Sequence, residues 1–143
     1  VTNQWVNSYK RLFGEPVAGQ VTEAPAYVCW GHANRSALVR VPMYKPGKAN
    51  STRVEVRSPD PACNPYLAFS AMLMAGLAGV ENQIDPGPPL DKNTYELSPR
   101  EAARLKTVPA SLDEALRALE QDHDYLLKGG VFTQDVLDAA PAV

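Results

Sequence analysis

The pattern of apolar residues changes near Pro59, and this change limits the chain to one fold class. Before Pro59, short stretches that alternate apolar and polar residues are separated by glycine, proline and asparagine clusters; they are 26–30, 37–41 and 52–57. A period of two is typical of β-strands, whereas the spacing after Pro59 is helical. The sequence therefore predicts an α+β fold in which antiparallel strands, within 1–60, are followed by packed helices, within 61–143.

The segment 66–80 carries the strongest helix signal. Asn64 is suited to cap this helix, because its side-chain oxygen accepts from free backbone N–H groups, and Pro65 fits the first helical position. Apolar residues cover every face of the segment, which predicts a helix that packs inside a larger body.

Two capping boxes mark the start of further helices, each a serine followed three residues later by a glutamate: Ser98 with Glu101, and Ser111 with Glu114. The second box opens a segment with apolar residues at helical spacing, which we expect to continue to the glycine pair at 129–130. A last short helix is expected to begin near Thr133.

The length of 143 residues, with 45% hydrophobic and 21% charged residues, suits one globular domain. The longest apolar stretch, 66–80, is shorter than the ~18 to 20 residues of a membrane span, so we expect no membrane association. Residues 1–9 lack the pattern of a secretory signal, and two cysteines, Cys29 and Cys63, are too few for a disulfide framework. We therefore expect a cytoplasmic protein with reduced thiols.

Charge is divided unevenly along the chain. Residues 1–58 contain eight lysines and arginines against three acids, a net charge of +5, whereas residues 59–143 carry −7. The basic part should face an anion. Its arginines are spread through strand-like sequence and form no basic run, so we expect a compact anion such as a phosphate or a carboxylate, and no nucleic acid.

The densest charged cluster is formed by Arg53, Glu55 and Arg57, which alternate with two valines. On a strand this alternation places the three charged side chains on one face. A carboxylate between two guanidinium groups should stay ionised and suits a divalent cation, while each arginine can bind a carboxylate or phosphate through two N–H groups. The alternative is a salt-bridge ladder on a solvated strand face.

Arg35 and Arg40 bracket the apolar stretch 37–39. On a regular strand two residues five positions apart lie on opposite faces, so we expect one of the two arginines in the loop that starts the strand.

Several segments, taken in chain order, resemble the C-terminal part of the catalytic domain of bacterial-type glutamine synthetase. They are 7–12 (NSYKRL), 23–25 (EAP), 34–37 (NRSA), 40–42 (RVP), 53–60 (RVEVRSPD) and 64–67 (NPYL). Further matches at 73–77, 91–97 and 129–133 extend the resemblance over nearly the whole chain. Each segment alone is degenerate, but their common order argues against a chance match.

The resemblance implies ATP-dependent ligation of ammonia to glutamate through γ-glutamyl phosphate, which gives glutamine. The partners it implies are glutamate, ammonia and ATP, with Mg²⁺ or Mn²⁺ as the metal, in a homo-oligomer that is a dodecamer in the family. The basic part of the chain agrees with this, since phosphoryl transfer needs cations around the moving group and glutamate needs arginines for its carboxylates.

The resemblance also implies roles for individual residues. The implied glutamate-binding residues are Arg11, Glu23, Arg35 and Arg57, with Arg57 on the α-carboxylate. The implied ATP-binding residues are Arg35, Arg40, Lys48 and Arg53, of which Arg35 and Arg40 also stabilise the transferring phosphoryl group. Glu55 corresponds to a metal ligand. Glu23 corresponds to a glutamate on a flap that closes the site and helps deprotonate ammonium, so Glu23 and Arg35 are the implied catalytic residues.

Two features leave alternatives open. Tyr95 resembles the tyrosine that some bacterial members adenylylate, and a plain surface tyrosine is the alternative. The flap region 13–23, which we expect to be mobile without ligand, is longer than in the compact bacterial form and lacks the tyrosine before the glutamate. A related γ-glutamyl ligase that uses a larger amine, such as a polyamine, is therefore the alternative to an ammonia ligase.

A non-catalytic structural relative is the third possibility, and the retained arginines and Glu55 argue against it. The chain starts in the middle of the family's catalytic domain, and Glu55 is the one acid that resembles a metal ligand. A hard divalent ion is coordinated by about six oxygen ligands. We therefore expect the segment alone to be inactive, to expose an apolar patch and to self-associate.

Overall fold

The computed structural model describes residues 25–44, 46–60, 63–109 and 111–139. Its short strands are β1 (Trp30–His32), β2 (Val39–Val41) and β3 (Glu55–Val56), with the 3₁₀ turn η1 (Ala49–Ser51) before β3. The later elements are α2 (Pro65–Glu81), η2 (Thr94–Glu96), α3 (Pro99–Ala102), α4 (Leu112–Gln121), α5 (Asp124–Leu127), η3 (Lys128–Gly130) and α6 (Gln134–Ala139). The predicted α+β class is confirmed.

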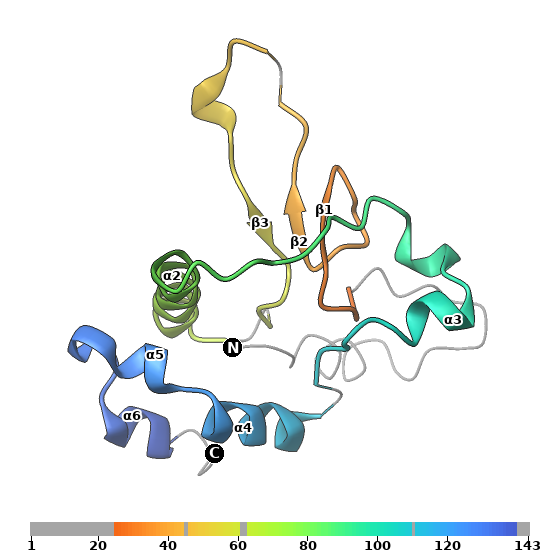
Figure 1. The fold of residues 1–143 in the computed structure, drawn as a ribbon. Helices are drawn as coiled ribbons and strands as arrows, with labels where there is room; N and C mark the ends of the chain where they lie inside the picture. Colours follow the sequence, from red (N-terminus) through yellow and green to blue (C-terminus); the bar gives the residue numbers. More distant parts are fainter. Residues whose placement is uncertain (1–24, 45, 61–62, 110, 140–143) are drawn as a thin grey trace.

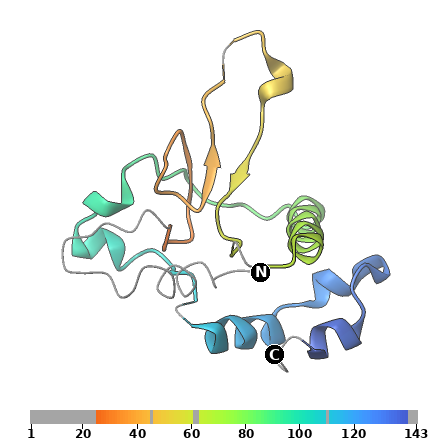
Figure 2. The same cartoon turned by 180° about the vertical axis from the view of Figure 1, so that it is seen from behind.

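The hairpin of β2 and β3 projects from the rest of the chain in Figure 1, while α2 lies beside the base of β3. The helices α4, α5 and α6 form a layer below the sheet and α2 (Figure 1). The segment between α2 and η2 crosses the base of the sheet, as the view from behind in Figure 2 also shows. There Leu90 N donates to Trp30 O at 2.7 Å.

The sheet has the order β1-β2-β3. As predicted, β2 and β3 are antiparallel, with Arg40 opposite Glu55. The prediction of antiparallel strands is corrected for the first pair, because β1 and β2 run parallel, with Trp30 opposite Val39. These strands are three residues long, so a connection of about six residues, which can extend roughly 20 Å, is enough to return the chain to the start of β1.

The first predicted strand, 26–30, pairs with a distant segment. Val28 N donates to Lys106 O at 2.8 Å, and Val108 N donates to Ala26 O at 2.9 Å. β1 itself begins only at Trp30 and continues past the predicted end. The alternating pattern thus located extended backbone near this position but did not identify its partner.

The helix α2 begins as predicted. Asn64 Oδ1 accepts from Tyr66 N at 3.0 Å and from Leu67 N at 3.4 Å, and Pro65 occupies the first helical position. These bonds satisfy two of the N–H groups that every helix leaves free at its start.

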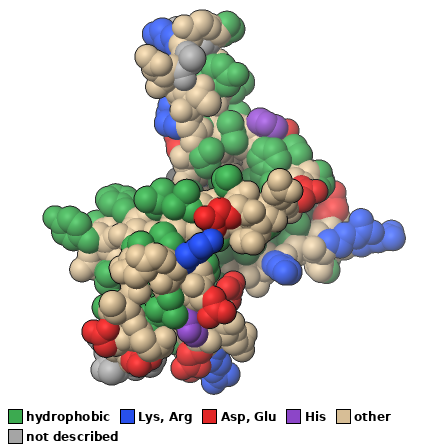
Figure 3. Space-filling view, turned by 60° about the vertical axis from the view of Figure 1, so that its left-hand side comes forward, with side chains coloured by type: hydrophobic (Ala, Val, Ile, Leu, Met, Phe, Trp, Pro, Cys, Tyr) green, Lys and Arg blue, Asp and Glu red, His purple; other side chains and the backbone are tan. Residues whose placement is uncertain are grey.

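Most of α2 is exposed in the part of the chain that the structure describes. Its buried residues are Ala68, Ala71 and Met74. Larger side chains are exposed, among them Tyr66 (82%) and Phe69 (67%). Figure 3, which brings this side of the molecule forward, shows hydrophobic side chains gathered across it. Within the described ranges, no helix is both long and apolar enough to cross a bilayer.

A small apolar core joins α2 to the C-terminal helices. Its buried members are Ala71, Met74, Leu126, Phe132 and Leu137, and parts of α4 and α5 pack against them.

This core accompanies a break in the helix expected from Ser111 to 129–130. The helix ends at Gln121 and α5 begins at Asp124, which corrects the expected single helix. At the break Asp122 has φ −144° and ψ 85°, and His123 Nδ1 lies 2.9 Å from Leu119 O. The change of direction brings α5 against α2 and buries Leu126.

Both predicted capping serines begin helices. Ser98 and Glu101 form a complete capping box, in which Glu101 Oε2 accepts from Ser98 N at 2.8 Å and Ser98 Oγ accepts from Glu101 N. Ser111 Oγ accepts from Glu114 N at 3.1 Å at the start of α4. The last helix, α6, begins one residue after Thr133.

Candidate functional site

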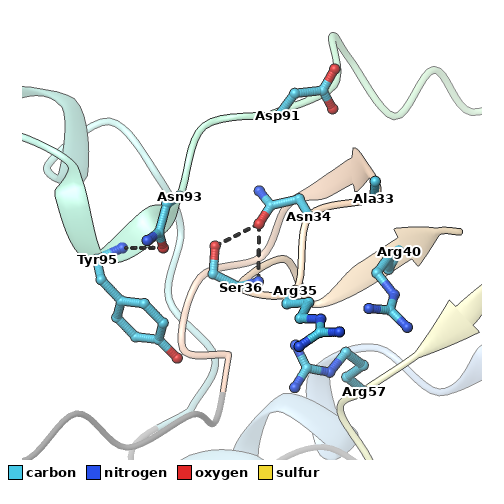
Figure 4. Close-up of a pocket in the computed structure, with 9 residues that line it drawn as sticks. All are labelled: Ala33, Asn34, Arg35, Ser36, Arg40, Arg57, Asp91, Asn93 and Tyr95. Atoms are coloured by element: carbon cyan, nitrogen blue, oxygen red, sulfur yellow. Dashed lines mark hydrogen bonds between the residues drawn. The ribbon is translucent and has the colours of Figure 1, made fainter. Parts of the chain in front are cut away.

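A pocket of about 430 Å³ lies between the sheet and the segment that leads into η2. Arg35, Arg40 and Arg57 line one side of it, whereas Asp91 and Tyr95 lie on the other. Figure 4 shows the three guanidinium groups gathered on the same side of the pocket. Sequence analysis named all three arginines as candidates, and the structure brings them together.

Arg35 stands on the turn that connects β1 to β2. Its neighbours Asn34 and Ser36 are buried, whereas Arg35 itself is exposed and lines the pocket. Arg40 lies within β2. The expectation that one of the two arginines lies in the loop before the strand is therefore confirmed. The turn supplies one guanidinium group to the pocket and the strand supplies another.

Arg40 is aimed by Glu55 on the neighbouring strand. Arg40 Nε donates to Glu55 Oε2 at 2.9 Å, and Arg40 Nη2 donates to the same oxygen. Arg53 donates to Glu55 Oε1 from Nη2 at 3.0 Å and from Nε at 3.2 Å. The bonds from Arg40, and then those from Arg53, hold the pKa of Glu55 below its usual value. Glu55 is therefore ionised at neutral pH and holds two arginines.

The structure divides the charged trio of 53–57. Arg57 lines the pocket, and its Nη1 is buried. Arg53 and Glu55 instead form an ion-pair ladder with Arg40, in which the Arg53 side chain is 58% exposed. An ion-pair ladder is the alternative interpretation of this segment, and the expected sharing of one face by all three charged side chains stays a prediction. Glu55 acts on the pocket through Arg40.

The donor groups that the structure describes do not form a metal site. Among those residues, no three histidine, cysteine, aspartate or glutamate side chains are grouped so that they could hold a metal ion. Both carboxylate oxygens of Glu55 bond to arginines. Since a hard divalent ion takes about six oxygen ligands, the described residues do not fit one by themselves. The role of Glu55 as a metal ligand stays a prediction that requires further ligands.

The opposite wall of the pocket contains acceptors that sequence analysis did not single out. Asp91 Oδ1 accepts from His32 N at 2.7 Å, and Asp91 Oδ2 lies 3.3 Å from His32 Nδ1. The His32 backbone N–H, and then its imidazole, lower the pKa of Asp91. Asn93 Oδ1 accepts from Tyr95 N at 3.2 Å and caps η2. The segment 91–97 contributes to the family resemblance, but nothing in its sequence pattern indicates that it faces the arginines.

Tyr95 is 47% exposed at the edge of the pocket. This exposure agrees equally with a modified tyrosine and with a plain surface tyrosine, so the modification stays a prediction.

Lys48 is separate from the three arginines and lies in the connection between β2 and β3. It lines a separate hollow with Gly47, Asn50 and Ser51, and Ser51 Oγ donates to Lys48 O at 2.7 Å. Arg11, Glu23 and the predicted flap 13–23 lie outside the described residues.

Comparison with known proteins gives a consistent result. A family described as "Glutamine synthetase, catalytic domain" matches residues 1–141. The chain is 51% identical to a glutamine synthetase from Neisseria gonorrhoeae over 139 residues, which are 97% of this chain and 28% of that protein. It is 58% identical to a glutamine synthetase from Mycobacterium tuberculosis over 122 residues, which are 84% of this chain and 26% of that protein.

A solved structure agrees in fold. The cryo-electron-microscopy structure of Plasmodium falciparum glutamine synthetase matches with a TM-score of 0.70 at 24% sequence identity, over 97% of this chain and 33% of that one. The chain thus spans less than a third of the length of the curated relatives that it matches.

Proposed function

Because the chain belongs to the family of glutamine synthetase catalytic domains, we propose that it forms part of an enzyme that joins ammonia to glutamate. In the proposed reaction a side-chain carboxylate oxygen of glutamate attacks the γ-phosphorus of ATP and ADP leaves. Ammonia then attacks the carbonyl carbon of γ-glutamyl phosphate, phosphate leaves, and a proton is lost to give glutamine. The chain is shorter than a third of its relatives, so the activity is proposed for the full-length protein.

The observation that carries this proposal is the convergence of Arg35, Arg40 and Arg57 on one pocket. Among the described residues that line the pocket, one carboxylate accompanies the arginines, that of Asp91, and it is bonded to His32. Positive charge therefore exceeds negative charge there. Guanidinium groups present paired N–H donors that match the oxygens of phosphates and carboxylates. Both proposed reactants, ATP and glutamate, carry such oxygens.

We assign Arg35 and Arg40 to the ATP phosphates and to the phosphoryl group in transfer, and Arg57 to the α-carboxylate of glutamate. Phosphoryl transfer spreads negative charge over the equatorial oxygens, and guanidinium groups that are already in place stabilise that charge without reorganising. The bonds between Glu55 and Arg40 support this assignment, because they fix the direction of one guanidinium group before substrate binds.

The remaining assignments extend the same proposal. Arg11 and Glu23 would complete the glutamate site, with Glu23 accepting a proton from ammonium. Arg53, which is bonded to Glu55, would contribute to ATP binding. Lys48, in the connection between β2 and β3, would also contact ATP. Mg²⁺ or Mn²⁺, held by Glu55 together with ligands from elsewhere in the protein, would neutralise phosphate charge.

We also propose that the full-length protein is a cytoplasmic homo-oligomer, a dodecamer as in the family. The free thiols of Cys29 and Cys63 support a reducing compartment. The isolated 143-residue chain is expected to be inactive, since it lacks a complete set of metal ligands among its described residues.

The test measures phosphate release from ATP by the full-length protein, with glutamate and ammonium added separately and together. We expect release to require both, and Arg35→Ala to lower kcat by about 100- to 1,000-fold. The matched control is Arg117→Ala, which removes an exposed arginine whose partner is Asp113 on α4. Such surface pairs contribute little, so its activity should equal that of the parent protein. Full activity in Arg35→Ala, or release without glutamate, would overturn the proposal.

The acceptor is tested separately by replacing ammonium with a series of larger amines. Ammonium should give the highest kcat/KM. A polyamine that exceeded it would favour the related γ-glutamyl ligase.

A further inference from the structure

Asn34 lies between the turn that carries Arg35 and the opposite wall of the pocket, and it is 8% exposed. Its Nδ2 donates to two backbone carbonyls, Leu90 O at 2.7 Å and Lys92 O at 2.9 Å. Its Oδ1 accepts from Ser36 N at 2.9 Å and from Ser36 Oγ at 2.7 Å. An asparagine side chain offers two N–H donors and two acceptor lone pairs, so its full hydrogen-bonding capacity is used.

The partners of Asn34 fix the orientation of its amide. The carbonyl oxygens of Leu90 and Lys92 only accept, and the backbone N–H of Ser36 only donates. Turning the amide over would place its oxygen against two carbonyl oxygens and leave the buried groups without bonds, which is costly. An aspartate at this position would lack the two N–H donors, and an alanine would lack both the donors and the acceptor.

Ser36 extends this connection across the pocket. Thr94 N donates to Ser36 Oγ at 2.8 Å, and the same hydroxyl donates to Asn34 Oδ1, as the dashed lines of Figure 4 show for the latter bond. Ser36 and Thr94 are both buried. Side chains of the turn that carries Arg35 therefore bond to every second residue of the segment 90–94, at Leu90, Lys92 and Thr94.

We propose that Asn34 is a positioning residue that fixes the Arg35 turn against the segment 90–94 and so sets the separation of the two walls of the pocket. This inference rests on the proposed function, in which Arg35 acts on an anion bound between those walls. Arg35 directly follows Asn34, and its own side chain is exposed, so the direction of its guanidinium group depends on the backbone of the turn. Without the amide, the turn loses its two bonds to the carbonyl oxygens of Leu90 and Lys92, and the bond from Thr94 N to Ser36 Oγ remains.

The experiment compares Asn34→Ala, Arg35→Ala and the double variant in the full-length protein, with Asn64→Ala as the matched control. Asn64 is also an asparagine that accepts from two donors, but it caps α2 and lies outside the pocket. A displacement of about 1 Å lowers enzyme rates by up to roughly 100-fold, so we expect Asn34→Ala to lower kcat by about 10- to 100-fold. Because Asn34 acts through Arg35, the double variant should be no slower than Arg35→Ala.

The outcomes are separable. If the two losses multiply in the double variant, or if Asn64→Ala lowers kcat as much as Asn34→Ala does, the positioning role is wrong. If Asn34→Ala is fully active while Arg35→Ala is inactive, the proposed function stands and this inference fails. If Arg35→Ala is fully active, the proposed function itself fails.

Ser36→Ala provides a milder variant if Asn34→Ala does not fold. It removes the hydroxyl that links Thr94 N to Asn34 but keeps the backbone bond from Ser36 N. It should lower kcat by a smaller factor than Asn34→Ala, and that loss should vanish when Arg35 is already alanine. Full activity of Ser36→Ala would overturn the inference in that case.

Discussion

Gly31 is the position at which one added methyl group tests how the pocket is held together. A Cβ built on Gly31 would lie 2.3 Å from Leu90 O and 3.0 Å from Leu90 C. Close carbon–oxygen contacts are about 3.3 Å, so the backbone at Leu90 must move by roughly 1 Å in Gly31→Ala. That backbone is also bonded to Trp30 O and to Asn34 Nδ2, each at 2.7 Å, and the movement strains both bonds.

The expected loss of stability follows from these contacts. Overpacking costs about 1 to 3 kcal/mol and a hydrogen bond contributes about 1 kcal/mol net, so we expect Gly31→Ala to lower the free energy of unfolding by about 2 to 4 kcal/mol. The wall that carries Asp91 and Tyr95 moves with Leu90, and kcat/KM should fall by at least about 10-fold.

Denaturant unfolding and steady-state kinetics of the full-length protein measure the two effects. The control is Gly76→Ala in α2, where the described residues place no atom within 4 Å of the added Cβ apart from its chain neighbours and the helix's own backbone, and a helical alanine should stabilise by about 0.5 to 1 kcal/mol. Parent-like stability and kinetics in Gly31→Ala would refute the reasoning, because they would show that segment 90–94 does not pack against β1.

Three further predictions follow from single contacts. Leu126→Ala removes the most buried member of the core between α2 and the C-terminal helices and should cost about 2 to 5 kcal/mol in denaturant unfolding; a loss below about 1 kcal/mol would contradict that packing. Bonds from Ser98, and then from Lys92, lower the pKa of Glu101 to about 2. A carboxyl pKa that is lower in the folded state stabilises the fold above the unfolded pKa, and this contribution disappears as the pH falls through the folded pKa. The capping box at the start of α3 should therefore persist to about pH 2 to 3. A midpoint near 4.3 for Glu101 in a carboxyl chemical-shift titration would contradict this. Arg40→Ala should raise the pKa of Glu55 more than Arg53→Ala does, because the bonds from Arg40 lower it most, and the same titration with equal shifts in both variants would refute that order.

The features that could be predicted from the sequence depend on neighbours within one helical turn or one strand. Asn64 and Pro65 identified the start of α2, because capping requires only the next few backbone N–H groups. Strand periodicity alone predicted that one of the two arginines, Arg35 or Arg40, lies in the loop before the strand. The three arginines could also be named, since their residue type and order carried the family resemblance.

The features that could not be predicted depend on contacts far along the chain. Asn34 and Ser36 bond to partners 56 to 58 residues away, and no local pattern indicates which distant backbone a buried amide will meet. The parallel pairing of β1 and β2 depends in the same way on where the connecting turn is anchored. The break between α4 and α5 is decided by the packing of Leu126 against α2, because helical spacing alone favours continuation.

The helix α2 combines both cases. Its composition is apolar on every side, so the sequence predicted burial without indicating a preferred face. The described chain covers chiefly small positions, such as Ala68 and Ala71, whereas large side chains such as Phe69 and Leu73 are exposed. Burying each such large side chain is worth about 1.5 to 3 kcal/mol, so most of the stabilisation available to this helix lies in contacts beyond the described residues. This distribution agrees with a chain that spans less than a third of its relatives, and it supports assigning the proposed activity to the full-length protein.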